Sequence, residues 1–395
     1  MQPEHSPSTT DNPIPLCIPE IQGNEWLYIK DCLDTGWVSS VGAYVDKFEN
    51  ALRHYTGAGH AVATVNGTAA LHVALLCAGV GPEDEVLVPC ITFIAPANAV
   101  RYTGAWPVFI DVEDRYWQMD PQRVDDFLRR GCVYRNRQLT NKTTGRRVAA
   151  ILPVHILGHA VDMDPILELA HRFELPVIED ATEGLGAKYK NRPLGTIGDI
   201  GCFSFNGNKI ITTGGGGMIV SNNPDWAEKA RYLTTQAKDN PIEYIHNEIG
   251  YNYRLTNLQA AMGCAQMEML DRFVAAKRRI ASYYNDHLSK VKGIILPNES
   301  PDTFSTFWLY TIRVNERDYG MDCRGLMKKL ANRNIQTRPL WQPLHCSPAH
   351  ASSPKIGGEV AQRLFNEGLS IPCSVGLPTT HQKQVIQAID SYATN

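Results

Sequence analysis

The chain has 395 residues, of which 43% are hydrophobic and 20% are charged. This composition is typical of a folded globular protein, and the length allows a large domain and a smaller one. Its 38 Lys and Arg against 41 Asp and Glu give a net charge of −3, which argues against a general nucleic-acid-binding protein. No apolar run reaches the roughly 20 residues that cross a bilayer, so we expect no membrane partner.

The N-terminus lacks the charged and apolar regions of a signal peptide, and we expect a cytoplasmic protein. Four prolines among the first fifteen residues predict an extended arm over residues 1–20. The ten cysteines form no CxxC pair and have no histidine at metal-ligand spacing. We therefore expect small buried thiols in a reducing compartment and no metal site.

From residue 43 onward, helical and strand patterns alternate. Residues 43–57 predict a helix with Phe48 and Leu52 on its apolar face. The strands expected next are 60–65, 85–89, 106–112, 148–154 and 175–180, and the helices between them are 67–80, 96–104, 121–130 and 164–173. These strands are continuously apolar, which is typical of a parallel sheet with helices on both faces.

After residue 198 the pattern changes. The expected elements are strands at 198–205 and 216–222, a long helix at 256–289, a half-buried strand at 305–314 and a helix that begins with Asp322 as its N-cap. The glycine-rich turn at 212–218 does not match a P-loop and indicates a sharp turn with close backbone approach. We expect a large α/β domain over residues 21–270 and a small α+β domain over residues 271–395.

Polar residues follow several of the predicted strands, at the edge of the sheet where α/β proteins bind ligands. Thr68 begins a helix in VNGTAALH, Asp180 ends a strand, and Lys209 comes five residues after Ser204. Each has an ordinary alternative, such as a helix cap or a surface lysine. Together they supply a nucleophilic amine, a carboxylate and an anion-binding helix start, which are the parts that pyridoxal phosphate requires.

The ordered series VNGTAALH, VPCITFIA, VIEDATEGLGA, GDIGCFSFNGNKIITTGGGG and IGYNYRLTNLQAAMG closely resembles the DegT/DnrJ/EryC1/StrS family of nucleotide-sugar aminotransferases. The resemblance extends from about Gly36 into the small domain. It implies the fold type I architecture of pyridoxal 5′-phosphate (PLP)-dependent aminotransferases and a homodimer with shared active sites. The LegC-type subgroup, associated with bacillosamine-type and legionaminic-acid pathways, is the most similar.

The resemblance also implies the roles of individual residues. Lys209 would bind the cofactor covalently and move the proton, and Asp180 would pair with the pyridinium nitrogen. The other residues expected to bind the cofactor are Gly67, Thr68, Ala69 and Ser204 at the phosphate, Phe93 on the ring, and Asn252 from the other subunit. Glu183 replaces a glutamine common in the family and would face the phenolic oxygen of the cofactor.

The reaction implied is transfer of an amino group from L-glutamate to C4 of a UDP-linked 4-keto-6-deoxy-N-acetylhexosamine. The alternative is the same chemistry on GDP-4-keto-6-deoxymannose, as in a perosamine route. Retention of Lys209 argues against the dehydratases of this fold, and the absence of GxGxxG after the first strand argues against an oxidoreductase.

Further residues are candidates for substrate binding. The basic stretch 131–147 contains Arg146 and Arg147, which we expect to meet the substrate's diphosphate; the alternative is a solvated surface hairpin. The candidates for the sugar pocket are Ser39, Lys238, His246 and His345.

Overall fold

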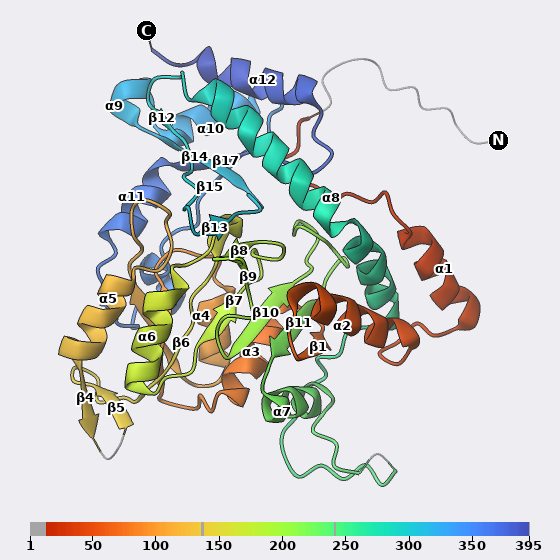
Figure 1. The fold of residues 1–395 in the computed structure, drawn as a ribbon. Coiled ribbons are helices and arrows are strands. Elements are labelled where there is room, and N and C mark those ends of the chain that lie inside the picture. The colour runs from red at the N-terminus through yellow and green to blue at the C-terminus, as the bar shows by residue number, and fades with distance from the viewer. Residues whose placement is uncertain (1–12, 136–137, 241, 395) are drawn as a thin grey trace.

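The computed structural model describes residues 13–135, 138–240 and 242–394. A mostly parallel sheet lies at the centre of its larger part (Figure 1). The strand order is β16-β3-β2-β6-β7-β10-β11-β1, in which parallel bridges from Ile151 to Val177 and from Val154 to Asp180 join β6 to β7. Within this sheet, β11 runs antiparallel to both of its neighbours.

All strands of this sheet except β16 correspond to predicted strand segments; β16 lies in the part of the chain that we expected to form the small domain. Their bounds are β1 (His60–Thr64), β2 (Glu85–Pro89), β3 (Trp106–Ile110), β6 (Val148–Ile151), β7 (Ile178–Asp180), β10 (Ile200–Ser204), β11 (Gly217–Ser221) and β16 (Lys355–Ile356). Consecutive side chains enter two different cores, as Val108 and Phe109 do on β3. Both faces of the sheet are therefore buried, which explains why the strands are apolar throughout.

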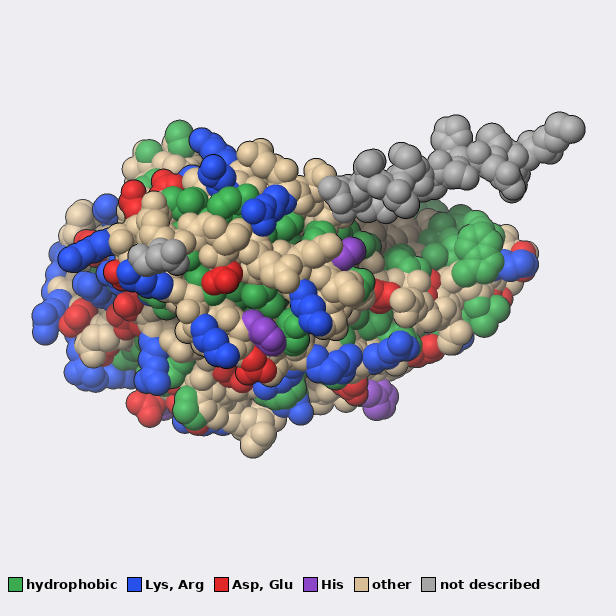
Figure 2. Space-filling view, turned by 90° about the horizontal axis from the view of Figure 1, so that it is seen from above, with side chains coloured by type: hydrophobic (Ala, Val, Ile, Leu, Met, Phe, Trp, Pro, Cys, Tyr) green, Lys and Arg blue, Asp and Glu red, His purple; other side chains and the backbone are tan. Residues whose placement is uncertain are grey.

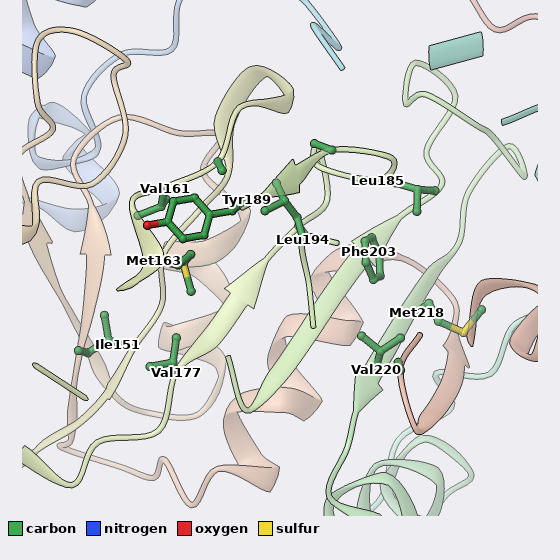
Figure 3. Packing of buried hydrophobic residues seen from close by; sticks show 14 of the residues in the cluster. Ile151, Val161, Met163, Val177, Leu185, Tyr189, Leu194, Phe203, Met218 and Val220 are labelled. Carbon is green, nitrogen blue, oxygen red and sulfur yellow. The ribbon is translucent and has the colours of Figure 1, made fainter. Parts of the chain in front are cut away.

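Helices cover the two faces of the sheet. The first core contains Val177, Phe203 and Met218, packed against helices α2, α6 and α8 (Figure 3). The second core contains residues of α3, α4, α7 and α11. The helices around the sheet are α1 (Glu25–Thr35), α2 (Ala43–Thr56), α3 (Gly67–Cys77), α4 (Ala95–Tyr102), α5 (Pro121–Asp126), α6 (Met163–Phe173), α7 (Pro224–Thr234) and α11 (Glu359–Glu367). This arrangement agrees with the fold type I architecture that the resemblance implies.

The C-terminal part contains a second, antiparallel sheet. Its order is β12 (Ile294–Ile295), β14 (Tyr310–Val314), β17 (Gly368–Ile371) and β15 (Arg338–Pro339). The helices here are α9 (Glu316–Tyr319), α10 (Cys323–Ala331), α12 (Thr379–Asp390) and the end of α8 (Asn257–Leu288). Asp322 is the N-cap of α10, as predicted, and its carboxylate accepts the N–H of Gly325 at 2.7 Å.

The predicted strand at 305–314 is shorter in the structure and begins only at Tyr310. Phe307 has φ +50°, in the left-handed region, which is incompatible with a continuous strand. The strand is also buried rather than half-buried, because both of its faces are covered. Tyr310 and Ile312 enter the C-terminal core, and on the other face Thr311 is hydrogen-bonded to Ser370.

Helix α8 connects the two parts of the molecule. Its side chains up to Val274 join the first core, and those from Ile280 onward join the C-terminal core. The division of the chain at residue 270 stays a prediction. The N-terminal arm was predicted over residues 1–20, of which 1–12 lie outside the described residues. The described part lies against the C-terminal sheet, where the carbonyl oxygen of Leu16 accepts the N–H of Cys373 at 2.8 Å.

The remaining elements are short. They are a hairpin of β4 (Cys132–Arg135) and β5 (Gln138–Asn141), a small sheet of β8 (Lys188–Tyr189), β9 (Arg192–Pro193) and β13 (Thr303–Phe304), a π-helical turn at Phe127–Gly131, and 3₁₀ turns at Ile156–Gly158, Leu344–Cys346 and Pro348–His350. In the described ranges, no helix is long and apolar enough to cross a membrane. The same residues contain no cluster of three His, Cys, Asp or Glu side chains suited to a metal ion.

Candidate active site

A cleft of about 410 Å³ opens at the carboxyl ends of the central strands, between the sheet and residues of the C-terminal part. Strands β1, β2, β7 and β10 all point toward it, so the polar residues that follow them meet there. The predicted residues that line the cleft are Gly67, Thr68, Phe93, Asp180, Glu183, Ser204 and Lys209. Their convergence supports the sequence-based choice of this edge of the sheet.

Asp180, the last residue of β7, is a buried carboxylate that faces the cleft. Its Oδ1 accepts the N–H of Thr182 at 3.0 Å. Burial raises the pKa of Asp180, an effect that the hydrogen bonds from Thr182 and the charge of Lys209 oppose. A buried carboxylate with so few donors needs a cationic partner, and the protonated nitrogen of a pyridinium ring fits this requirement.

Lys209 reaches the cleft from the loop after β10. Its Nζ lies 3.4 Å from Oε1 of Glu183 and 4.1 Å from the centre of the Trp308 ring. The Trp308 indole also donates to the carbonyl oxygen of Asn208 at 2.7 Å, which fixes the backbone immediately before the lysine. The amine is thus held in the cleft by a carboxylate on one side and an aromatic face on the other.

The second carboxylate oxygen of Glu183 accepts a hydrogen bond from a residue with a strained backbone conformation. Its Oε2 accepts the N–H of Leu157 at 2.8 Å, and Leu157 has φ +60°, in the left-handed region. Burial raises the pKa of Glu183, while the charge of Lys209 lowers it. Glu183 therefore lies where it can exchange a proton with the Lys209 amine, as well as contact a cofactor.

The start of helix α3 forms an anion site. The N-cap residue Asn66 accepts the N–H of Ala69 at 2.8 Å through its side chain, which leaves the N–H groups of Gly67 and Thr68 at the open helix end. A Cβ on Gly67 would lie 2.8 Å from the Cβ of Ser204, so the Ser204 hydroxyl borders the same site. This arrangement fits a phosphate group. Ala69, which was expected in the cradle, instead donates to its own N-cap.

The glycine-rich turn at 212–218 supports the anion site from beneath without lining it. Gly217 pairs with both Thr64 and Ser204 in the sheet, and a Cβ there would lie 2.5 Å from the carbonyl oxygen of Asn66. The turn allows close backbone approach beneath the anion site, as the sequence indicated.

The cleft as a whole fits PLP. It has an amine at Lys209, a buried carboxylate at Asp180 and the anion site at the start of α3. The Phe93 ring is 56% exposed at the wall of the cleft, so its face is free to stack on a planar ring.

Arg146 and Arg147 do not reach this cleft within the same chain, contrary to our expectation. The Arg147 guanidinium pairs with Asp84, and Nε of Arg146 lies 3.0 Å from Oε2 of Glu83 and its guanidinium stacks over Trp106. These residues lie beside the amino ends of the parallel strands, near the β4–β5 hairpin (Figure 1). The cleft is at the opposite ends, so the geometry favours the surface alternative.

The other substrate candidates also lie outside the cleft of their own chain. Ser39 is exposed, and its carbonyl oxygen accepts the N–H of Asn257 at 2.6 Å. His345 lies in a 3₁₀ turn, packed against Gly358. Lys238 and His246 belong to the segment after α7, which extends away from the body of the molecule (Figure 1). Asn252 lies at the base of this segment, where it pairs with Thr235. Their assignment stays a prediction, since it requires a second subunit.

Sequence reasoning missed several residues of the cleft. Trp308, Arg338 and Trp341 come from the C-terminal part and complete the wall opposite the sheet. Trp308 was assigned to a strand, and Arg338 and Trp341 follow no recognisable motif. The sequence around β15, with Arg338 and Trp341, is only a weak indication of a binding site. These side chains reach the cleft only because of the way in which the C-terminal part packs on the sheet.

Comparisons with known proteins agree with this site. Residues 19–390 match the DegT/DnrJ/EryC1/StrS aminotransferase family. The chain is 40% identical to a GDP-perosamine synthase of Caulobacter vibrioides, and the match covers 95% of this chain and 97% of the relative. It is 38% identical to a GDP-perosamine synthase of Escherichia coli O157:H7, with 96% and 97% coverage, and 38% identical to a putative pyridoxal phosphate-dependent aminotransferase of Bacillus subtilis, with 95% and 94% coverage.

The structure is also similar to solved structures of aminotransferases. A DegT DnrJ EryC1 StrS aminotransferase from Brucella abortus superposes with a TM-score of 0.86 at 29% identity, over 94% of this chain and 96% of that one. DesV of S. venezuelae superposes with a TM-score of 0.84 at 32% identity, over 94% and 95%. The match over nearly the whole chain, together with the fit of the cleft, makes this protein an aminotransferase whose cofactor is PLP. The chain belongs to the DegT/DnrJ/EryC1/StrS aminotransferase family.

Proposed function

We propose that this protein transfers an amino group from L-glutamate to C4 of GDP-4-keto-6-deoxymannose, giving a GDP-linked 4-amino sugar. The observation that carries the proposal is its relation to proteins named GDP-perosamine synthase. Three of them are 35–40% identical over at least 95% of this chain. They support the GDP-linked alternative better than the UDP-linked substrate or the bacillosamine and legionaminic-acid pathways.

The residues of the cleft supply what this reaction needs from the protein. PLP, when bound, provides the electron sink for both half-reactions. The Asp180 carboxylate keeps a positive charge at the ring nitrogen favourable, and the start of α3 binds a phosphate. Lys209 Nζ can take a proton from one substrate carbon and return it to another, while Glu183 at 3.4 Å keeps this amine in place.

A cationic and aromatic rim is available for the substrates. Arg338 is exposed at the cleft, which Trp341 also lines. Arginine is suited to phosphate or carboxylate groups, and a nucleobase or sugar ring can stack on the aromatic faces. The proposal therefore places the anionic groups of the substrates near Arg338 rather than near Arg146 and Arg147.

We also propose a homodimer with shared active sites. Helix α1 and the segment after it expose Trp26 (79%) and Trp37 (57%), and the segment after α7 exposes Ile242 (86%) and Ile249 (84%). Figure 2 shows hydrophobic side chains gathered at the end of the molecule where α1 lies. Such apolar surface is typical of an interface between subunits. A second copy would cover both regions and could bring Asn252 to the partner's phosphate site.

The substrate proposal is tested with purified enzyme, L-glutamate and matched GDP-linked and UDP-linked 4-keto-6-deoxy sugars, with products identified by mass and NMR. We expect a higher kcat/KM for the GDP-linked sugar and an amino group at C4 of the product. Lys209→Ala is the control and should give no product. Turnover of the UDP-linked sugar alone would favour the UDP-linked hypothesis instead. Turnover of neither sugar would contradict both substrate hypotheses.

A further inference from the structure

A buried ammonium group lies behind the cleft, outside the machinery described above. Lys277 of α8 is 2% exposed, and its Nζ donates to the carbonyl oxygens of Trp308 at 2.8 Å and Cys373 at 2.6 Å. Among the described residues, none of the ion pairs with Asp or Glu involves Lys277. A buried charge with only carbonyl partners is costly, so a further anionic partner would stabilise it.

Two thiols occupy that position. The Sγ of Cys17 lies 3.4 Å from Lys277 Nζ, and the Sγ of Cys373 lies 3.6 Å from it. The backbone holds the two cysteines side by side, because the N–H of Cys373 donates to the carbonyl oxygen of Leu16. Residues 356 positions apart in the sequence therefore meet at one buried cation. Cys17 is half-buried and Cys373 is buried, so a small reagent would meet Cys17 first.

The surroundings favour a thiolate at Cys17. The neighbouring Cys373 side chain and the positive charges of Lys277 and Lys209 lower the pKa of Cys17, although burial acts in the opposite direction. One contact favours the thiol form instead, since Cys17 Sγ lies 3.6 Å from the carbonyl oxygen of Asn208, to which an S–H can donate. Elsewhere in the chain burial dominates, as it does at Cys264, where it raises the pKa to about 12.

We propose that Cys17 and Cys373 form a peroxide-reactive dithiol, in which the Lys277 ammonium holds Cys17 as the attacking thiolate. This inference does not depend on the identity of the sugar substrate. Cys323 also contacts a cation, at 3.4 Å from the Arg324 guanidinium, but burial raises the pKa of that thiol. At Lys277, in contrast, two cysteines share one buried ammonium group.

The reaction proceeds in two steps. The Cys17 thiolate attacks one oxygen of hydrogen peroxide, so that an S–O bond forms, the O–O bond breaks, and hydroxide leaves and is protonated to water. The Cys373 sulfur then attacks the Cys17 sulfur, so that an S–S bond forms and the S–O bond breaks. The leaving oxygen takes the proton of Cys373 and departs as a second water. Two thiols are oxidised, and one peroxide is reduced.

The bond would form at the base of the active site. Cys17 Sγ contacts the carbonyl oxygen of Asn208, which directly precedes Lys209, and Cys373 follows β17 of the C-terminal sheet. Oxidation would therefore tie the N-terminal segment covalently to the C-terminal part beside the loop that carries the catalytic lysine.

The test uses reduced holoenzyme, hydrogen peroxide at neutral pH and peptide mapping after the remaining thiols are blocked. We expect a Cys17–Cys373 linked peptide to form before any product at the exposed Cys346. Lys277→Met should slow its formation on the order of tenfold, because it removes the charge that stabilises the thiolate. The matched control Cys346→Ser should not change the rate.

A second variant keeps the proposal testable if Lys277→Met does not fold. In Cys373→Ser the resolving thiol is missing, so peroxide should leave Cys17 as a sulfenic acid that a 1,3-diketone reagent labels. An unlabelled Cys17 in this variant, an equal rate in folded Lys277→Met, or oxidation of Cys346 ahead of the pair would each overturn the proposal.

Discussion

At the scale of single residues, the buried charge of Asp180 destabilises the folded protein when no cofactor is bound. A cationic ring nitrogen beside it would offset this unfavourable free energy. Burial raises the pKa of Asp180 in the folded protein, so the native state holds this proton more tightly than the unfolded chain does. The resulting stability is fully present below the unfolded pKa, near 3.8, and is lost as pH rises through the folded pKa.

Asp180→Asn keeps an acceptor for the N–H of Thr182 and removes the charge. We expect the cofactor-free variant to be more stable than the cofactor-free parent at neutral pH, with a difference that shrinks toward pH 4. Urea unfolding over this range measures it. Binding of PLP should be weaker in the same variant. A variant that is less stable than the parent at neutral pH would contradict the assignment of an uncompensated buried carboxylate.

The predicted residues that the structure brings into the cleft and the cleft residues that sequence analysis missed differ in what positions them. Asp180, Ser204 and Gly67 lie in or next to strands of one sheet, so topology alone brings them together. Trp308 and Arg338 reach the cleft only because the C-terminal part packs over it, which no local pattern encodes. The role of Ala69 at the phosphate stays a prediction; in this structure its N–H donates to the side chain of Asn66.

At the scale of elements, buried strands and long helices were predictable because their apolar patterns are continuous. The exceptions are local: the strand expected from residue 305 begins at Tyr310, because Phe307 adopts a left-handed conformation. The β4–β5 hairpin shows that local sequence is also insufficient to predict a functional role. Its basic composition was visible in sequence, but its position at the amino ends of the strands was not.

This position gives the hairpin region a structural role that can be measured. Arg147→Gln removes the pair with Asp84 and a hydrogen bond to the Gly79 carbonyl oxygen, and should cost about 0.5–1 kcal/mol of stability. KM for the keto-sugar should not change, whereas Arg338→Gln, the matched arginine in the cleft, should raise KM for one of the two substrates. A raised keto-sugar KM in Arg147→Gln would return the diphosphate to this region.

At the scale of the whole molecule, the proposed dimer can be tested by complementation. If Asn252 acts in the partner's site, mixed dimers of Asn252→Ala and Lys209→Ala subunits contain one site with both native residues. Mixing the two impaired variants under conditions that exchange subunits should therefore restore part of the activity. No recovery in confirmed mixed dimers would mean that Asn252 acts within its own chain.

The central claim is that the cleft between the sheet and the C-terminal part holds PLP on Lys209. Borohydride reduction of the holoenzyme, followed by peptide mass mapping, tests it most directly, because reduction makes the attachment permanent. We predict a pyridoxyl group on Lys209 and none on the buried Lys277. Attachment at another lysine, or no attachment in an enzyme that retains the cofactor, would contradict the account.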